Sequence, residues 1–365
     1  MLILISIPVL LIIVVFAFLH LPRFGKLPSG ARLERIKKSV NYKNGHFQNL
    51  SETPMLTAEG GMFTVLKQFF FDKKTSVTPV DMIPSMKTDL LNLDPAKDVL
   101  VWFGHSSYFM QVDGKKILVD PVFSGAASPV SFNIKAFKGT NVYTTEDIPE
   151  IDFLFISHDH WDHLDYETIL KLKPKIKRIV CALGVGQHLE RWGFDKNSIN
   201  ELDWNEEINL GEGFTVNATV ARHFSGRGFV RNKTIWVSFI LHTPTMKIFI
   251  GGDSGYDTHF AEIGKTFGPF DLVILENGQY NKNWKYIHMQ PFETLQAAKD
   301  LQAKRVFPVH NSKFPLATHP WDEPLKKITE LNSDVNLNLA TPMIGEEIFL
   351  KDHTQKFSKW WEGIQ

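Results

Sequence analysis

Three histidines and an aspartate crowd into one short stretch of the sequence. The stretch ISHDHWDHLD places His158, His160, Asp162 and His163 within six positions. Neutral imidazole and carboxylate are ligands that a borderline cation such as zinc selects. The apolar run DFLFISH predicts a strand ending at His158, and residues two apart in an extended chain face the same way. His158 and His160 could therefore bind one cation from the same side.

A turn from this strand into a helix would separate the two halves of the stretch. If a helix follows at WDHLDYETILKL, Asp162 and His163 face a neighbouring position and could serve a second cation. Asp253, on a turn of small residues, is the natural group to bridge two cations. Paired cations lower the pKa of a bound water to about 7 and can hold both the attacking and the leaving oxygen of a displacement.

Other apolar runs also end in histidine or aspartate. ATVARH ends at His223, IFIGGD at Asp253 and VFPVH at His310. Chemistry sits at strand ends when loops must converge on one site. A single histidine at a strand end is more often a packed residue, but several such ends together with the cluster favour a metal site. Both His288 and His310 have a spacing that suits the last ligand.

The elements that must position these residues follow from the apolar pattern. From Asp98 onward, short apolar runs broken by turn residues predict strands, and Asp113-Gly114 is the turn of a hairpin. Later runs alternate with helical stretches, so we expect an α/β fold with helices on the outside of the sheets. The predicted strands lie in 99–104, 107–120, 152–158, 178–183, 215–223, 235–243, 247–253, 272–277 and 305–310, and the helical stretches are 165–174, 186–193 and 291–303.

Composition limits the possible partners. Lysine plus arginine (40) equals aspartate plus glutamate (40), so no global basic field indicates nucleic acid. The single cysteine, Cys181, excludes an internal disulfide and leaves any metal site to imidazole and carboxylate. A length of 365 residues with 43% hydrophobic side chains is ample for a buried core.

The N-terminal segment predicts a membrane anchor, assigned to residues 1–21. Leu2 to Leu19 is uncharged over a length near the roughly 20 residues that span a bilayer. Basic residues gather just after it, which predicts a single-pass protein with its catalytic domain on the cytoplasmic side. A cleaved signal peptide and a buried helix are the alternatives. Residues 22–58 then read as a basic juxtamembrane linker or lightly structured arm, and 59–365 as the globular domain.

The motif and its downstream residues resemble the metallo-β-lactamase superfamily, whose fold is a four-layer αβ/βα sandwich. Three longer stretches, VWFGHSSYFMQVDGKKILVDPVFSGAASP, GDSGYDTHFAEIGKTFGPFDLVIL and WKYIHMQPFETLQAA, are similar to one branch of it. That branch contains N-acyl-phosphatidylethanolamine-hydrolysing phospholipase D and its bacterial relatives. The resemblance runs from about residue 100 to residue 316.

The resemblance implies a role for each candidate residue. His158, His160 and His223 would hold a first metal, and Asp162, His163 and His310 a second, with Asp253 bridging. The strand-end His310 matches the last ligand, whereas His288 in KYIHMQP matches a histidine that contacts substrate or the transition state. Asp162 and His288 are therefore the expected catalytic residues.

The implied protein is a membrane-anchored dinuclear metallohydrolase that cleaves a phosphodiester in a lipid, by a phospholipase D-type reaction. Its cofactors would be two divalent cations, with zinc best suited to the ligands and manganese or iron as alternatives. Its partners would be a phospholipid, the membrane and a second copy in a homodimer. A hydrolase of another ester or a lactone on the same fold, and a non-catalytic membrane scaffold, are the rival functions.

Four further features leave alternatives open. Arg227 and Arg231 could clamp a phosphate or lie on a solvated loop. His105 either orients a ligand or packs in a turn, and the segment 121–143 is either a lid or a packed surface loop. The stretch GDSGY is similar to the nucleophile segment of trypsin-like proteases, but Tyr256 stands where they have glycine, so no serine nucleophile is expected at Ser254.

Overall fold

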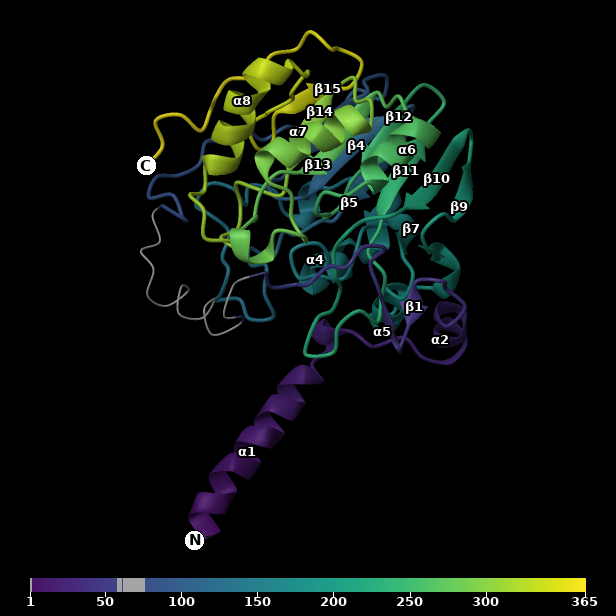
Figure 1. The fold of residues 1–365 in the computed structure, drawn as a ribbon, viewed down its shortest axis with the longest axis vertical. Coiled ribbons are helices and arrows are strands. Elements are labelled where there is room, and N and C mark those ends of the chain that lie inside the picture. The colour runs from purple at the N-terminus through teal and green to yellow at the C-terminus, as the bar shows by residue number, and fades with distance from the viewer. Residues whose placement is uncertain (1, 58–60, 62–75) are drawn as a thin grey trace.

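Two large β-sheets, packed face to face, make up the centre of the described structure (Figure 1). It is a computed structural model that describes residues 2–57, 61 and 76–365. The aromatic cluster around Phe63 and Phe69–Phe71, which the sequence suggests as a helix on the core or a lipid-facing surface, lies outside the described residues.

The first sheet carries the hairpin and the first parallel strands. Its order is β15-β3-β4-β5-β6-β7-β8, antiparallel from β15 to β5 and parallel from β5 to β8. Asp113 (φ 46°) and Gly114 (φ 76°) form the predicted turn, because a two-residue hairpin favours positive φ at both positions. The strands are β3 Val99–Trp102, β4 Tyr108–Val112, β5 Lys115–Val119, β6 Ile151–Ile156, β7 Ile176–Ala182, β8 Ile199–Leu202 and β15 Glu347–Phe349.

The second sheet has the order β14-β13-β12-β11-β10-β9. Its strands β9 to β12 pair antiparallel, whereas β12, β13 and β14 pair parallel. The strands are β9 Glu207–Gly211, β10 Phe214–Thr219, β11 Ser238–His242, β12 Lys247–Ile250, β13 Leu272–Glu276 and β14 Val306–Val309.

Alternation along the strands explains the layers. In β11, Phe239 and Leu241 join the core between the sheets, whereas Ile240 between them joins a separate core under helices α6 and α7. The ring of Phe239 meets that of Phe155 on β6 at 5.3 Å between centroids, across the two sheets. The central strands of the second sheet, such as β11 and β13, are thus buried on both faces, as strands between two layers require.

Helices join the parallel strands and cover the outer faces. The helix α4 connects β6 to β7, and α5 lies between β7 and β8, so the expected α/β sandwich is confirmed. The longer helices are α4 Tyr166–Leu172, α5 Gly186–Arg191, α6 His259–Phe267, α7 Pro291–Asp300 and α8 Glu323–Val335. Short 3-10 helices are Pro22–Phe24, Thr145–Asp147, Lys173–Lys175, Lys196–Ser198 and Lys282–Trp284.

The N-terminal segment forms one helix, α1 (Leu2–Leu19), which extends away from the body in Figure 1. Within the described part of the chain, no helix combines the length and the apolarity needed to cross a membrane.

The segment after α1 is more ordered than its polar composition suggests. It forms α2 (Gly30–Ile36) and the hairpin of β1 (Tyr42–Lys43) and β2 (His46–Phe47). Ile36 and Phe47 are fully buried in the main core, so the expectation of a linker or lightly structured arm outside the core needs correction. The segment needs few apolar residues, because hydrogen bonds and ion pairs such as Arg32–Glu201 (2.6 Å) fix its other residues to the body of the protein. We call residues 22–57 the arm.

Candidate metal centre

The candidate residues meet at the carboxyl ends of strands from both sheets. The strand β6 ends at Ile156 and is followed by residues 157–165, which we call the metal loop, before α4 begins. Asp253 follows β12, and His310 directly follows β14. The predicted strand-to-helix turn is therefore present, although His158 and His160 lie in the loop beyond the strand rather than within it.

Three imidazoles form what we call the first half-site. Nδ1 of His160 lies 2.9 Å from Nε2 of His158 and 3.3 Å from Nε2 of His223. One nitrogen from each ring lies within 4.8 Å of the others, close enough to share a cation. The structure thus brings together the residues expected to hold the first metal.

A carboxylate and two imidazoles form the second half-site. Asp162, His163 and His310 gather with one ligand atom each within 4.8 Å, and His105 belongs to the same group. Oδ2 of Asp162 lies 3.5 Å from Nε2 of His163 and 2.8 Å from Nε2 of His105. His105, which the sequence left undecided, therefore lies against a candidate ligand.

Asp253 lies between the half-sites. Its Oδ2 is 3.9 Å from Nε2 of His158 and 3.7 Å from Nε2 of His223, on the first side. The same carboxylate lies 3.2 Å from Nε2 of His163 and 3.3 Å from Nδ1 of His310, on the second side. The carboxylate of Asp253 thus lies within 4 Å of ligand atoms from both half-sites. It is in a position to bridge two cations.

Unpartnered polar atoms show that this cluster suits a cation. Among the described residues, Nε2 of His163 and Oδ1 of Asp253 are buried without a hydrogen-bond partner. Leaving such atoms unsatisfied is costly, and a cation would satisfy both. Burial also lowers the pKa values of His158, His223 and His310 well below their ordinary range, which keeps these imidazoles neutral as ligation requires. The chain therefore has a His/Asp cluster able to bind metal.

Further side chains orient the candidate ligands. Oδ2 of Asp120 lies 2.8 Å from Nδ1 of His163, and Nδ1 of His223 lies 2.9 Å from the carbonyl of Ile287. Bonds of this kind leave the other nitrogen of each ring for a cation and fix the ring orientation. Asp120 follows β5 directly and is a strand-end carboxylate that our sequence reasoning missed, although the same signal identifies it.

His288 faces the site with a buried carboxylate behind it. Its Nδ1 lies 2.5 Å from Oε2 of Glu276, the last residue of β13. Burial raises the pKa of Glu276 to about 7. Burial acts to lower the pKa of His288, but the Glu276 carboxylate raises it further than burial lowers it. The pair therefore retains a proton near neutral pH, and Glu276 is a second functional residue that the sequence reasoning missed.

A cavity of about 190 Å³ opens over both half-sites. Its lining combines His288 and candidate ligands from both half-sites with four apolar side chains. The lining residues are His160, Asp162, His223, Phe224, Asp253, Gln279, Trp284, Ile287, His288, His310 and Leu316.

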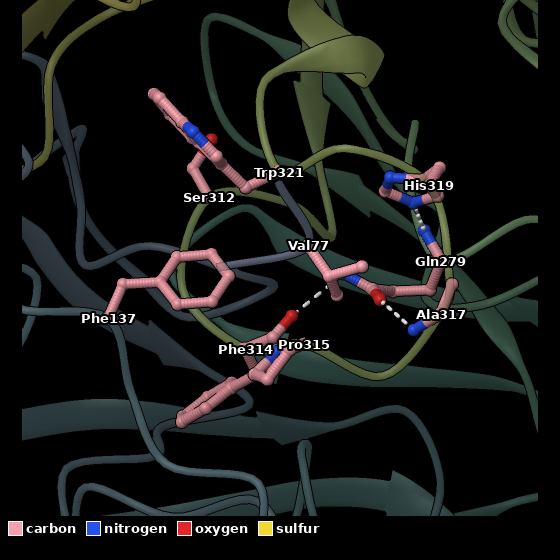
Figure 2. A pocket seen from close by; sticks show the side chains of 9 residues that line it. All are labelled: Val77, Phe137, Gln279, Ser312, Phe314, Pro315, Ala317, His319 and Trp321. Carbon is pink, nitrogen blue, oxygen red and sulfur yellow. Dashed lines mark hydrogen bonds between the residues drawn. The ribbon is translucent and has the colours of Figure 1, made fainter. Parts of the chain in front are cut away.

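Gln279 lines this cavity and also a second, smaller pocket, which Figure 2 shows. Its side-chain oxygen accepts hydrogen bonds from the backbone N–H groups of Leu316 and Ala317, at 3.0 and 2.8 Å. Its own backbone N–H donates to Nε2 of His319. The loop after His310 is thereby tied to the loop after β13, which keeps Leu316 against the cavity.

The remaining alternatives are resolved by burial and contacts. Arg227 is 4% exposed and donates to main-chain carbonyls, so it is neither a phosphate clamp nor a solvated residue. Arg231 is exposed and stacks 5.1 Å from the centroid of Phe224 at the cavity wall. Ser254 is not among the residues that line the site cavity, and its buried hydroxyl accepts a hydrogen bond from the backbone N–H of Arg222 at 2.9 Å. The segment 121–143 packs by Phe123 against Phe103, and the side chains that line the site cavity come from other segments.

Comparisons with known proteins agree with this geometry. Residues 115–311 match the model of the beta-lactamase superfamily domain. An uncharacterized protein of Mycobacterium tuberculosis is 34% identical over 331 residues, covering 89% of this chain and 88% of its own. N-acyl-phosphatidylethanolamine-hydrolyzing phospholipase D 1 of Caenorhabditis elegans is 31% identical, covering 63% of this chain and 68% of its own.

Solved structures show the same fold. A possible metal-dependent hydrolase of Veillonella parvula superposes with a TM-score of 0.55 at 17% identity, covering 70% of this chain and all of that one. The sequence match covers more than half of the chain and includes every candidate ligand. The chain belongs to the metallo-β-lactamase superfamily as a metal-dependent hydrolase, in the branch that contains the N-acyl-phosphatidylethanolamine-hydrolysing phospholipases D.

Proposed function

We propose that this protein is a dinuclear metallohydrolase that cleaves the phosphodiester of N-acyl-phosphatidylethanolamine-like lipids, by a phospholipase D-type reaction. The observation that carries the proposal is the position of Asp253 between two half-sites that face one cavity together with His288. The similarity to the Caenorhabditis elegans enzyme supports the choice of lipid.

The proposed ligands divide as the geometry does. His158, His160 and His223 would hold one divalent cation and Asp162, His163 and His310 the other, with Asp253 within reach of both groups. Zinc suits imidazole and carboxylate ligands best, with manganese and iron as alternatives. Bound cations of this kind lower the pKa of a water molecule and offset charge on phosphoryl oxygens.

The chain's own residues supply orientation and a proton. Glu276 binds Nδ1 of His288, so the other ring nitrogen is left for a phosphoryl or leaving oxygen in the cavity. Asp162 is fixed by His105, which keeps its carboxylate directed at the second half-site. The apolar side chains of Phe224, Trp284, Ile287 and Leu316 offer a surface for the hydrocarbon part of a lipid.

The same proposal places the protein at a membrane. Leu10 to Phe16 of α1 expose 40–67% of their surface, more apolar area than a helix in water usually shows. Two exposed aromatics, Phe132 (78%) and Phe229 (83%), lie on loops beside the residues that follow α1: Arg23 bonds the carbonyl of Pro129, and Phe24 lies beside Gly228. A bilayer would cover all of these, with the catalytic domain on the cytoplasmic side.

The test presents the metal-loaded protein with vesicles of N-acyl-phosphatidylethanolamine, vesicles of plain phospholipids, and a panel of lactones. We expect phosphatidic acid and the N-acylethanolamine as products, identified by mass spectrometry. Lactone turnover without phospholipid turnover would favour the rival hydrolase, and bound metal without any turnover would favour a scaffold.

His288→Ala tests the assignment within the site. We expect kcat to fall while the bound metal is retained, because we assign the His288 side chain to contact with substrate rather than with metal. Phe349→Ala, on β15 away from the cavity, is the control. Unchanged turnover in the His288 variant would remove this histidine from the mechanism.

A further inference from the structure

The turn at the foot of α1 lies directly on the metal loop. The ring of Phe24 meets the ring of Trp161 edge to face at 5.1 Å between centroids, and Trp161 stands between His160 and Asp162. The indole N–H of Trp192 donates to the carbonyl of Pro22 at 2.8 Å. The first residues of the arm are thus packed against the segment that carries most of the candidate ligands.

One buried guanidinium joins these two segments. Nη1 of Arg227 donates to the carbonyl of Asp159 at 2.9 Å and to that of Leu164 at 2.7 Å. Those two carbonyls flank His160, Asp162 and His163, so Arg227 closes the metal loop across its ends. Its Nε donates to the carbonyl of Arg23 at 3.0 Å, and its plane lies 3.9 Å from the centroid of Trp161.

Asp159 and His188 make a second connection. The Asp159 carboxylate accepts from the backbone N–H of Gly226 at 2.6 Å and lies 3.1 Å from Nε2 of His188. Nδ1 of His188 accepts from the backbone N–H of Lys26 at 3.0 Å. With its proton on Nε2, the imidazole therefore connects the arm to the residue between His158 and His160. In the sequence Asp159 is only a spacer of the motif and His188 belongs to no motif, so nothing there marks either residue.

Gly25 makes the close approach possible. Its φ of 71° lies in the left-handed region, and a Cβ there would lie 2.0 Å from Nδ1 of His188. Any larger residue must therefore move either the arm or His188. The arm also reaches the remaining ligand of the first half-site, because Asn49 bonds both the backbone N–H and the carbonyl of His223.

We propose that Arg227, Asp159 and His188 are positioning residues that couple the arm to the first half-site, so that the docked arm sets its affinity for metal. The inference rests on the proposed function in that the half-site must bind a cation. The arm would then contribute to the metal centre and not only tether the domain to α1. Displacement of the arm, for example by movement of α1, would then weaken metal binding at a site to which the arm contributes no ligand.

The first test compares two buried arginines that each bond main-chain carbonyls. Arg227→Met keeps an apolar body between the tryptophans but loses the hydrogen bonds. Arg305→Met is the matched control, because Arg305 is 1% exposed and bonds the carbonyls of Phe349 and Asp352, away from the metal loop. Cobalt is titrated into the full-length metal-free variants, and the visible absorption band is recorded against a competing chelator.

We expect Arg227→Met to weaken cobalt binding at the first half-site, the weaker of the two sites, by about 10–100-fold and to alter the absorption band of that site. Arg305→Met should lower the melting temperature while leaving cobalt affinity at the wild-type value. Wild-type affinity in a folded Arg227→Met protein would overturn the coupling. If the wild-type protein itself bound no cobalt, the proposed function would fall, and this outcome is distinct.

The second test leaves the cluster residues unchanged. Gly25→Ala should displace the arm and weaken cobalt affinity as Arg227→Met does. Gly114→Ala, in the β4–β5 hairpin, has a similar φ of 76° but no atom within 4 Å of the added Cβ, so it reproduces the backbone strain without the clash. The double variant Gly25→Ala/Arg227→Met should lose less than the sum of the two effects, since both act through one contact. Equal cobalt affinities for Gly25→Ala and Gly114→Ala would refute the proposal.

Discussion

The two half-sites share Asp253 but are built differently. The first consists of three imidazoles, and its loops are held by the arm. The second contains the Asp162 carboxylate and is held from the first sheet by Asp120 and His105. A carboxylate offsets part of the charge of a divalent cation, whereas imidazole does not. One cluster therefore combines a neutral half-site whose loops contact a distant segment with an anionic half-site that side chains of the first sheet contact.

Loss of the shared carboxylate should erase the difference between the half-sites. Asp253→Ala removes the group within reach of both, so we expect both metals to bind weakly and phosphodiester turnover to fall by more than the ~100-fold upper range for residues that only orient ligands. Metal content by mass spectrometry and turnover of bis-p-nitrophenyl phosphate measure the two effects. Retention of one tight metal would show that Asp253 belongs to a single half-site.

Loss of a single ligand should separate them. We expect His158→Ala and His310→Ala each to lower bound metal from ~2 to ~1 per chain, and to leave opposite half-sites occupied. Because only the second half-site contains a carboxylate besides Asp253, the cation left in His158→Ala should be held more tightly. Chelator competition on the two variants tests this order. The reverse order would mean that charge does not decide affinity here.

Substitution of Asp120, the carboxylate that orients His163, should weaken metal binding at the second half-site alone. Asp120→Asn keeps the shape of the side chain but removes the charge 2.8 Å from Nδ1 of His163. We expect about 10–100-fold weaker metal binding at the second half-site and unchanged binding at the first. Asp89→Asn, on an exposed turn, is the control. Equal weakening of both half-sites would argue that Asp120 stabilises the whole fold instead.

The smallest effect on the metal centre is expected at Lys313, a buried lysine three residues after His310. Its ammonium donates to the carbonyls of Phe103 and Val122, and burial lowers its pKa to about 7. Between pH ~7 and ~10 the unfolded chain binds more protons at this side chain than the folded chain, so the free energy of unfolding should rise with pH in that window.

Lys313→Met should remove that slope and leave metal affinity unchanged. Urea unfolding of the metal-free protein at several pH values measures it, with the exposed Lys304→Met as the control that retains the slope. A slope that persists in Lys313→Met would assign the titration to another group.

Much of the site could be predicted because its signals are local. His158 to His163 are adjacent in the chain, and His223, Asp253 and His310 follow apolar runs. Asp120 and Glu276 carry the same strand-end signal, but a single acid after a strand has no motif to distinguish it. Arg227 was assigned to substrate or solvent because its burial depends on the arm, which is remote in sequence.

The arm itself was hidden by its composition. Ile36 and Phe47 are its fully buried apolar side chains among the described residues, and many of its other attachments are hydrogen bonds and ion pairs that a hydropathy pattern does not contain. The strands were easier: the apolar runs predicted from Val99 to His310 all contain observed strands. The weakly apolar edge strands β8, β9 and β15 were not predicted.

The most direct test of the two-half-site account is the number of metal ions per chain, measured together with phosphodiesterase activity during stepwise removal by a chelator. We predict ~2 divalent ions in the wild-type protein. Turnover should disappear as they are removed and return when zinc is added back. Full activity of a metal-free protein, or a stable content of one ion with full activity, would contradict the account.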